Sequence, residues 1–99
     1  MAETTVKVTR VTGQSDDART YRILTANSAS SMSEGDTITF KAVFQDNEGN
    51  IIKRTIKDAE GNAVTLTAID DMVVLDYNFL DIEATYSGTM PDDLKIYLF

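Results

Sequence analysis

The chain has 99 residues, a formal net charge of −7, and neither cysteine nor histidine. This length predicts a single domain, residues 1–99, and the missing residue types exclude disulfides, thiolate nucleophiles, zinc–thiolate sites and the usual neutral-pH proton shuttle. The opening residues show no basic segment followed by an apolar one, and no run approaches the ~20 apolar residues of a membrane span. We therefore expect synthesis in the cytoplasm and no membrane partner.

Charge is distributed unevenly along the chain. Up to Lys57, eight basic residues oppose seven acidic ones, whereas from Asp58 onward nine acidic residues oppose Lys95 alone. Phosphate contacts dominate nucleic-acid affinity, so a chain this acidic without a basic stripe is not expected to bind DNA or RNA. The acidic part is either a solvated surface that keeps the protein in solution or a docking face for a basic partner.

Apolar residues recur with a period of two along most of the chain, which predicts β-strands. In chain order, the first part predicts a strand with Val6 and Val8 that ends near Thr12, a strand from Tyr21 to Leu24, a serine-rich loop over residues 27–33, and a turn at Ser33-Glu34-Gly35-Asp36. The clearest alternation follows over residues 37–45, where one face carries Ile38, Phe40, Ala42 and Phe44. That strand is expected to be half buried.

One turn sequence then occurs twice, as Asp46-Asn47-Glu48-Gly49-Asn50 and Asp58-Ala59-Glu60-Gly61-Asn62. In each copy the Asp accepts hydrogen bonds from following backbone amides, and the Gly takes a positive φ that closes a short hairpin loop. Two such turns twelve positions apart predict a three-stranded antiparallel meander. In the middle strand, Arg54 either points inward and protects a sheet edge or extends its charged end to the sheet rim.

Three further strands are predicted in the rest of the chain. Their inward residues are expected to be Val64, Leu66 and Ala68, then Val73 and Leu75, with a bulge at Phe79-Leu80 that brings Ile82, Ala84 and Tyr86 back to the same side. A last strand carries Leu94, Ile96 and Leu98, and Phe99 is expected to be tied into the sheet.

These elements predict an all-β fold, an antiparallel β-sandwich of about seven to eight short strands of immunoglobulin-like or jelly-roll type. A small closed barrel is the alternative. The predicted core residues are Phe40, Phe44, Leu66, Leu75, Ile82 and Ile96.

The acidic residues do not form a recognisable catalytic or metal-binding motif. The adjacent pairs Asp16-Asp17, Asp70-Asp71 and Asp92-Asp93 lie at predicted turns, where Asp bonds to nearby backbone, and neighbours within a strand point to opposite faces. The repeated turns lack the spacing of a calcium-binding loop, and phosphate loops and nucleophile elbows are missing from the sequence. We therefore expect no enzymatic activity, no metal and no cofactor.

The last strand predicts an interaction surface. If Leu94, Ile96 and Leu98 fill the core, then Tyr97 and Phe99 lie together on the opposite face, where two exposed aromatic rings indicate a binding surface. Met72 and Val74 add apolar surface that also points outward. We expect Tyr97, Phe99, Met72 and Val74 to contact a protein partner, in a homo-oligomer or a larger assembly. Coverage by another part of the same chain is the alternative.

The string Glu34-Gly35-Asp36-Thr37-Ile38-Thr39-Phe40, followed by Phe44-x-Asp46-x-x-Gly49-x-Ile51, resembles the start of the N-terminal β-sandwich module of baseplate upper proteins from phages of Gram-positive bacteria. The resemblance covers about a fifth of the chain. It implies a structural component of a virion or tail assembly. Such modules usually head a longer chain, whereas this sequence stops at Phe99. Immunoglobulin-like repeats of bacterial surface proteins share the same turns and are the nearest rival.

The function hypothesis is a non-catalytic structural or interaction module, a phage or prophage-type component incorporated into a virion. The alternative is a soluble acidic inhibitor or decoy that binds a basic surface of a host protein. A structural component should self-associate through apolar surface, while a decoy should remain a monomer with steeply salt-dependent binding.

Overall fold

The computed structural model describes residues 3–11, 23–75 and 81–99, and the regular secondary structure in these residues consists of β-strands alone. The strands are β1 (Glu3–Arg10), β2 (Ile23–Asn27), β3 (Thr37–Gln45), β4 (Ile51–Thr55), β5 (Thr65–Leu66), β6 (Met72–Val74), β7 (Ile82–Ser87) and β8 (Lys95–Leu98). The all-β prediction is confirmed. The predicted strand start at Tyr21 and the bulge at Phe79-Leu80 lie outside the described residues.

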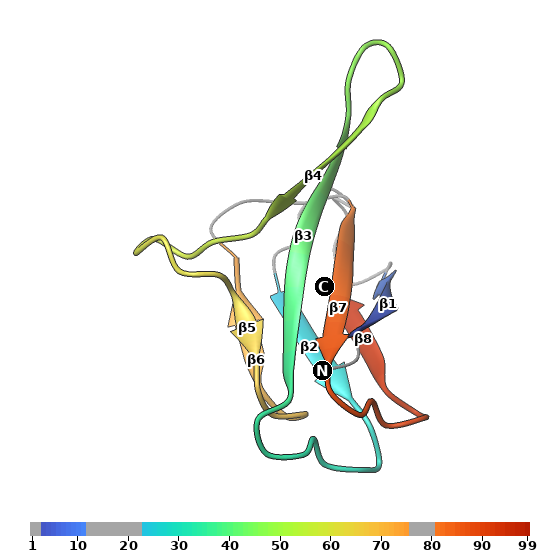
Figure 1. Ribbon diagram of the computed structural model, residues 1–99, viewed down its shortest axis with the longest axis vertical. Coiled ribbons are helices and arrows are strands. Elements are labelled where there is room, and N and C mark those ends of the chain that lie inside the picture. The colour runs from blue at the N-terminus through green and yellow to red at the C-terminus, as the bar shows by residue number, and fades with distance from the viewer. Residues whose placement is uncertain (1–2, 12–22, 76–80) are drawn as a thin grey trace.

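The described strands form one mixed sheet that curls into a half-barrel (Figure 1). Its order is β4-β3-β7-β1-β8-β2-β6, and β5 lies on the same edge of β3 as β4. Strand β1 serves both halves, because residues 3–7 run antiparallel to β7 and residues 8–10 run parallel to β8. The β1–β8 pair departs from the predicted antiparallel pairing. Side-chain alternation does not distinguish the two directions, since both place alternate residues on opposite faces.

The first repeated turn closes the β3–β4 hairpin as predicted. Asp46 Oδ1 accepts the backbone N–H groups of Glu48 and Asn50, each at 2.9 Å. Gly49 has a φ of 88°, a conformation that residues with a Cβ adopt at a cost. The Asp and the Gly of the motif therefore have the local roles that the sequence indicated.

The second turn has the same local geometry but a different place in the sheet. Gly61 has a φ of 86°, and Asp58 Oδ1 accepts the backbone N–H groups of Glu60 and Asn62 at 2.9 and 3.0 Å. The chain after it does not pair with β4 to complete a meander. Instead β5 rejoins β3, where Ile38 faces Leu66.

The register shows why the meander prediction is wrong. Thr55 and Thr65 are ten residues apart in the chain, but their partners on β3, Lys41 and Thr39, are only two residues apart. The eight surplus residues leave the sheet as a small hairpin, closed by a bridge between Lys57 and Ala63. The edge of β3 was still open beyond β4, and pairing there buries Leu66 completely.

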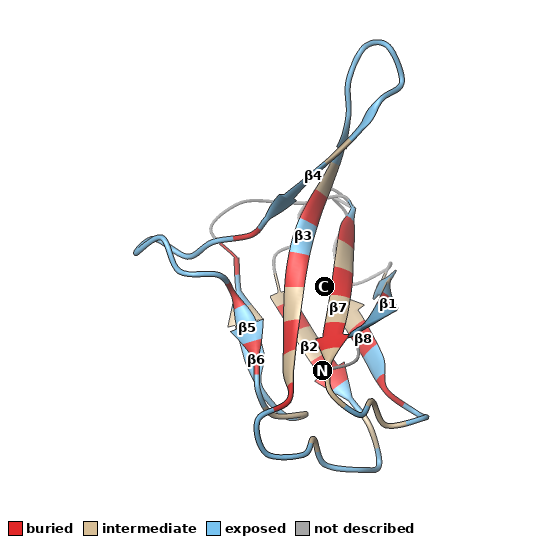
Figure 2. Cartoon of the chain, viewed as in Figure 1, coloured by how far each residue is buried: buried red, intermediate tan, exposed pale blue. Residues whose placement is uncertain are grey.

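The core lies on the concave side of the curled sheet, where the inward residues of neighbouring strands meet, and the buried bands on β3 and β7 show its extent (Figure 2). Five of the six predicted core residues are buried: Phe40, Leu66, Leu75, Ile82 and Ile96. Leu24, Ile38, Tyr86 and Leu98 join them with no exposed surface. The sixth, Phe44, is 48% exposed, so its prediction as a core residue is wrong.

Phe44 is exposed because β3 extends beyond the end of its pairing with β7. Pairing with β7 ends at Ala42 opposite Ile82, and beyond it the Val43 N–H donates to the Asp81 carbonyl at 3.1 Å. From there β3 and β4 continue as a two-stranded hairpin that projects from the body (Figure 1). We call residues 44–54 the arm. Phe44 keeps the inward parity of its strand, but none of the described strands covers it beyond the end of the β3–β7 pairing.

Candidate interaction surface

The four predicted interface residues come together on the convex side of β8, β2 and β6. Thr25 on the middle strand pairs with Tyr97 on one side and with Met72 on the other. One step along, Ile23 and Phe99 exchange backbone hydrogen bonds of 2.9 and 3.0 Å, and Ile23 also pairs with Val74. These bonds confirm that Phe99 is tied into the sheet.

Directly paired residues project to the same side of a sheet, so these two rows form one surface. We call it the outer face, and it consists of Ile23, Thr25, Met72, Val74, Tyr97 and Phe99. The alternate residues Leu24, Ile96 and Leu98 point the other way and are fully buried. Alternation predicted the side to which each residue points within its strand, whereas the strand order brings β6 and β8 to the two sides of β2.

The outer face is apolar and partly open to solvent. Met72 and Val74 are 63% and 61% exposed, and Tyr97 and Phe99 are half-buried with ring centroids 6.2 Å apart at 42°. Tilted ring pairs at this separation attract each other beyond the area that they bury. Covering such a surface would contribute about 25 cal/mol for each Å² of apolar area removed from water.

Acidic turns border the outer face at the end where β6 and β8 both begin. Near β6, the Asp71 carbonyl accepts the Thr25 hydroxyl at 2.9 Å, and the Asp71 N–H donates to the Ala68 carbonyl at 3.3 Å. Near β8, the Asp93 carboxylate accepts the Ser28 hydroxyl at 2.6 Å and the Ala29 N–H at 2.7 Å. Both Asp pairs lie at or beside turns, as predicted, but the Asp93 carboxylate bonds to a distant loop instead of nearby backbone, and the Asp71 bonds involve its backbone atoms.

The bonds at the turns also shift carboxyl pKa values. The hydroxyl of Ser28, followed by the Ala29 N–H, lowers the pKa of Asp93. The side-chain amide of Asn50, which donates to Asp46 Oδ2 at 3.0 Å, lowers the pKa of Asp46, and backbone donors of the same turn add to the effect. Both carboxylates are thus already used by the turns that they cap.

The predicted serine-rich loop closes one end of the outer face without covering it. Its residues 28–30 are held by Asp93, and the Ser30 N–H donates to the Ser28 hydroxyl at 3.1 Å. A shallow hollow of about 420 Å³ lies beside it, lined by Asn27, Ser28, Ala29, Asp93, Lys95 and Tyr97. The loop brings hydroxyl and amide groups to the rim of the outer face and little apolar surface.

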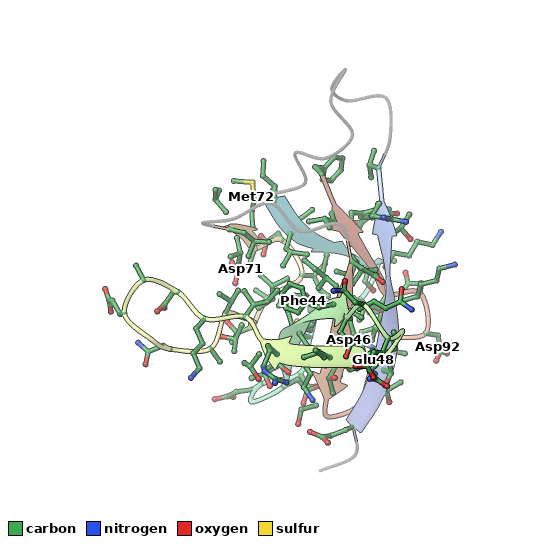
Figure 3. All side chains as sticks on the ribbon, turned by 90° about the horizontal axis from the view of Figure 1, so that it is seen from above. Phe44, Asp46, Glu48, Asp71, Met72 and Asp92 are labelled. Atoms are coloured by element: carbon green, nitrogen blue, oxygen red, sulfur yellow. The ribbon has the colours of Figure 1, made fainter. Side chains whose placement is uncertain are left out.

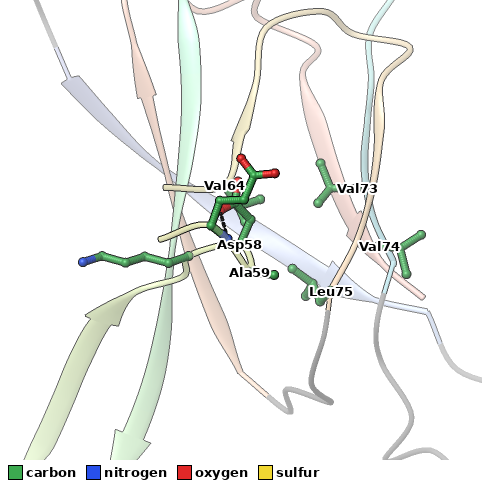
Figure 4. Close-up of a pocket in the computed structure, with 8 residues that line it drawn as sticks. Asp58, Ala59, Val64, Val73, Val74 and Leu75 are labelled. Atoms are coloured by element: carbon green, nitrogen blue, oxygen red, sulfur yellow. Dashed lines mark hydrogen bonds between the residues drawn. The ribbon is translucent and has the colours of Figure 1, made fainter. Parts of the chain in front are cut away.

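A second hollow, of about 290 Å³, lies between β6 and the small hairpin of the second turn (Figure 4). Val64, Val73 and Leu75 supply apolar side chains, and Lys57, Asp58 and Glu60 supply charged ones. The Asp58 carboxylate in this hollow is bonded to its own turn. Its chemistry is that of a turn packed against a sheet edge.

The sequence analysis missed a buried polar pair at the end of β7. Tyr86 is fully buried, and its hydroxyl donates to Oδ2 of the buried Asp36 carboxylate at 2.7 Å. Asp36 directly follows Gly35, so its bond to Tyr86 anchors the turn at residues 33–36 to the core. Burial, followed by the neighbouring Asp36 carboxylate, raises the pKa of Tyr86 to about 12. The available sequence signal was an inward Tyr two residues before a Gly, together with a Gly-Asp turn before β3.

The Tyr86 pKa predicts a loss of stability in alkali. The unfolded chain releases this proton near pH 10, while the folded chain holds it until about 12, so the stabilisation is complete below about pH 10 and is lost as the pH rises toward 12. When the pH is raised from about 9 to about 11, the urea midpoint should therefore fall more for the parent than for Tyr86→Phe, which has no phenol to ionise. Equal falls in both proteins would contradict the assignment.

Comparison with known protein families, with curated proteins and with solved structures gives no match for this chain. In the part of the chain that the structure describes, no helix has the length and apolar character needed to cross a membrane. Those same residues contain no group of three or more acidic side chains arranged to hold a metal ion. The surface features described above are thus the basis for any statement on function.

Proposed function

We propose that the chain is a non-catalytic structural module of β-sandwich type, which assembles with other protein chains through the outer face. The observation that carries the proposal is the gathering of Tyr97, Phe99, Met72 and Val74 on one exposed surface. A contiguous apolar patch on a soluble domain marks an interaction site, and Tyr, Phe and Met are enriched in such sites.

The setting that we propose is a phage or prophage-type virion or tail assembly. Support comes from the resemblance of residues 34–52 to the baseplate upper protein module. In this chain the Gly35-Asp36 turn leads directly into β3, and the Asp46 turn closes the hairpin that follows. An assembly component needs surfaces for lasting contact, and the outer face provides one.

A second candidate, the acidic decoy, is favoured by the charge distribution. Exposed carboxylates of Asp70, Asp71, Asp92 and Asp93 lie at one end of the outer face, in the part of the chain where Lys95 is the single basic residue. A basic protein surface would be attracted to such a rim. An immunoglobulin-like domain of a bacterial surface protein is a further alternative that rests on turn chemistry alone.

The Tyr97→Ser/Phe99→Ser variant tests the outer face. We expect the parent to show a mass that rises with concentration in light scattering. The variant should remain folded by circular dichroism and lose this concentration dependence. Thr65→Ser, an exposed change on β5, is the control and should assemble like the parent. Apolar contact predicts assembly that survives high salt, whereas a decoy predicts a monomer whose binding to a basic protein falls steeply with salt.

The opposite result has a clear form. If the double variant unfolds while the parent remains a monomer at high concentration, the two rings belong to the core and the interface proposal fails.

A further inference from the structure

The large hydrophobic side chains that the described residues expose fall into two groups. Phe44 and Ile51 lie on the arm, at 48% and 58% exposure, and Met72 and Val74 lie on β6. Strands β4 and β6 are the two ends of the sheet order, so each group sits at an edge of the sheet. A sheet edge with exposed apolar residues is prone to pair with another chain.

The arm carries a cation beside its apolar residues. Phe44 pairs with Ile52 and therefore shares its side of the hairpin, and Arg54 lies two residues further along the same side. Arg54 lies on the inward side of its strand, opposite the buried Ala42, but is itself exposed, and its Nη1 donates to the Lys53 carbonyl at 2.9 Å. One side of the arm thus presents an aromatic ring, an aliphatic side chain and a guanidinium group in sequence.

The β6 end of the outer face carries the complementary groups. Exposed Asp70 and Asp71 immediately precede Met72 in the chain. No basic residue occurs between Lys57 and Lys95. Figure 3, which looks along the arm, places Asp71 and Met72 side by side at the margin of the molecule and Phe44 over its middle. The two groups therefore lie on different parts of one copy.

We propose that the arm of one copy docks on the β6 end of the outer face of a second copy. Phe44 and Ile52 would cover Met72 and Val74, and Arg54 would approach Asp70 and Asp71. The inference rests on the proposed function and names its partner as this same chain. The argument for a second copy is that apolar and charge complementarity are both supplied by one sequence.

The contact joins two different surfaces, so it is a head-to-tail contact. Each copy that offers its outer face still has its arm free for the next copy. Repetition gives a ring when the rotation closes and a filament when it does not. Growth of this kind suits a component of a larger assembly.

Two variants and their mixture test the contact. The arm variant is Phe44→Ser/Ile52→Ser, and the face variant is Met72→Ser/Val74→Ser, with Thr55→Ser on β4 as the control. Each variant alone should need a concentration about tenfold higher or more for association, as measured by sedimentation velocity. An equimolar mixture should form dimers of one copy each, because the intact arm of the face variant meets the intact face of the arm variant.

Charge exchange tests the same contact without removing apolar surface from a strand. Arg54→Asp alone and Asp71→Arg alone should each weaken association, and both changes in one chain should restore it. This pair keeps the proposal testable if Ile52→Ser, at a half-buried position, impairs folding. Circular dichroism verifies the fold of each variant.

An arm variant that assembles like the parent overturns the inference, as does a mixture of folded variants that stays monomeric. If Tyr97→Ser/Phe99→Ser abolishes assembly while the arm variant does not, the outer face remains an interface and only the arm is excluded. A parent that is monomeric at all concentrations overturns the second copy as the partner.

Discussion

Replacing Gly88 by alanine is expected to lower the free energy of unfolding by about 3 to 5 kcal/mol. Gly88 has a φ of 125°, a region that residues with a Cβ rarely adopt, and an added Cβ would overlap the carboxylate of Asp36. That carboxylate has little room to move, because Asp36 is buried and accepts the Tyr86 hydroxyl. The substitution therefore strains the backbone and also breaks a buried hydrogen bond.

Two controls separate these effects. Gly35 has a φ of 87° with open space around its missing Cβ, so Gly35→Ala should cost only the backbone strain, about 1 to 2 kcal/mol. In an Asp36→Ala background, Gly88→Ala should likewise lose only the strain, because the carboxylate that it would strike is gone. Urea unfolding of the parent, of the three single variants and of the Asp36→Ala/Gly88→Ala double variant measures these costs. Equal costs of Gly88→Ala with and without Asp36 would contradict the packing argument.

The alternation of β3 shows what a sequence pattern specifies. Its bounds, Thr37–Gln45, match the predicted strand, and Ile38, Phe40 and Ala42 are buried as expected. The pattern gives the side to which a residue points, but coverage of that side depends on where neighbouring strands end. Strand β7 ends its pairing at Ala42, so Phe44 has the inward parity without an inward environment.

The repeated turn shows the same limit at the level of strand pairing. Local hydrogen bonding by Asp58 and the positive φ of Gly61 follow from the residues themselves. The strand that comes next is placed by a distant partner, the open edge of β3 beside Ile38. The parallel pairing of β1 with β8 is also a long-range choice, between the two ends of the described chain.

Four of the six members of the outer face were predicted from the sequence, but their arrangement was not. Tyr97 and Phe99 share a side by alternation within one strand, and so do Met72 and Val74. Their proximity depends on β2, which lies between β8 and β6 and aligns Thr25 with both Tyr97 and Met72. No local signal in the sequence specifies that order of strands.

Phe40 and Phe44 offer a matched comparison within one strand. Both point to the same side of β3, but Phe40 is 1% exposed and Phe44 is 48% exposed. Phe40→Ala is expected to cost about 3 to 5 kcal/mol of unfolding free energy, because it removes a ring from a packed core and leaves a cavity. Phe44→Ala in the monomer should cost about 1 kcal/mol or less, since the ring is already half in water.

Urea unfolding at two protein concentrations turns this pair into a test of both the core and the arm. The cost of Phe40→Ala should be large at either concentration, because its contacts lie within one copy. The cost of Phe44→Ala should grow with concentration if the arm docks on a second copy, since binding to the folded state adds stability by mass action. Similar losses for the two variants in dilute solution would mean that the arm packs against its own body and that Phe44 belongs to the core after all.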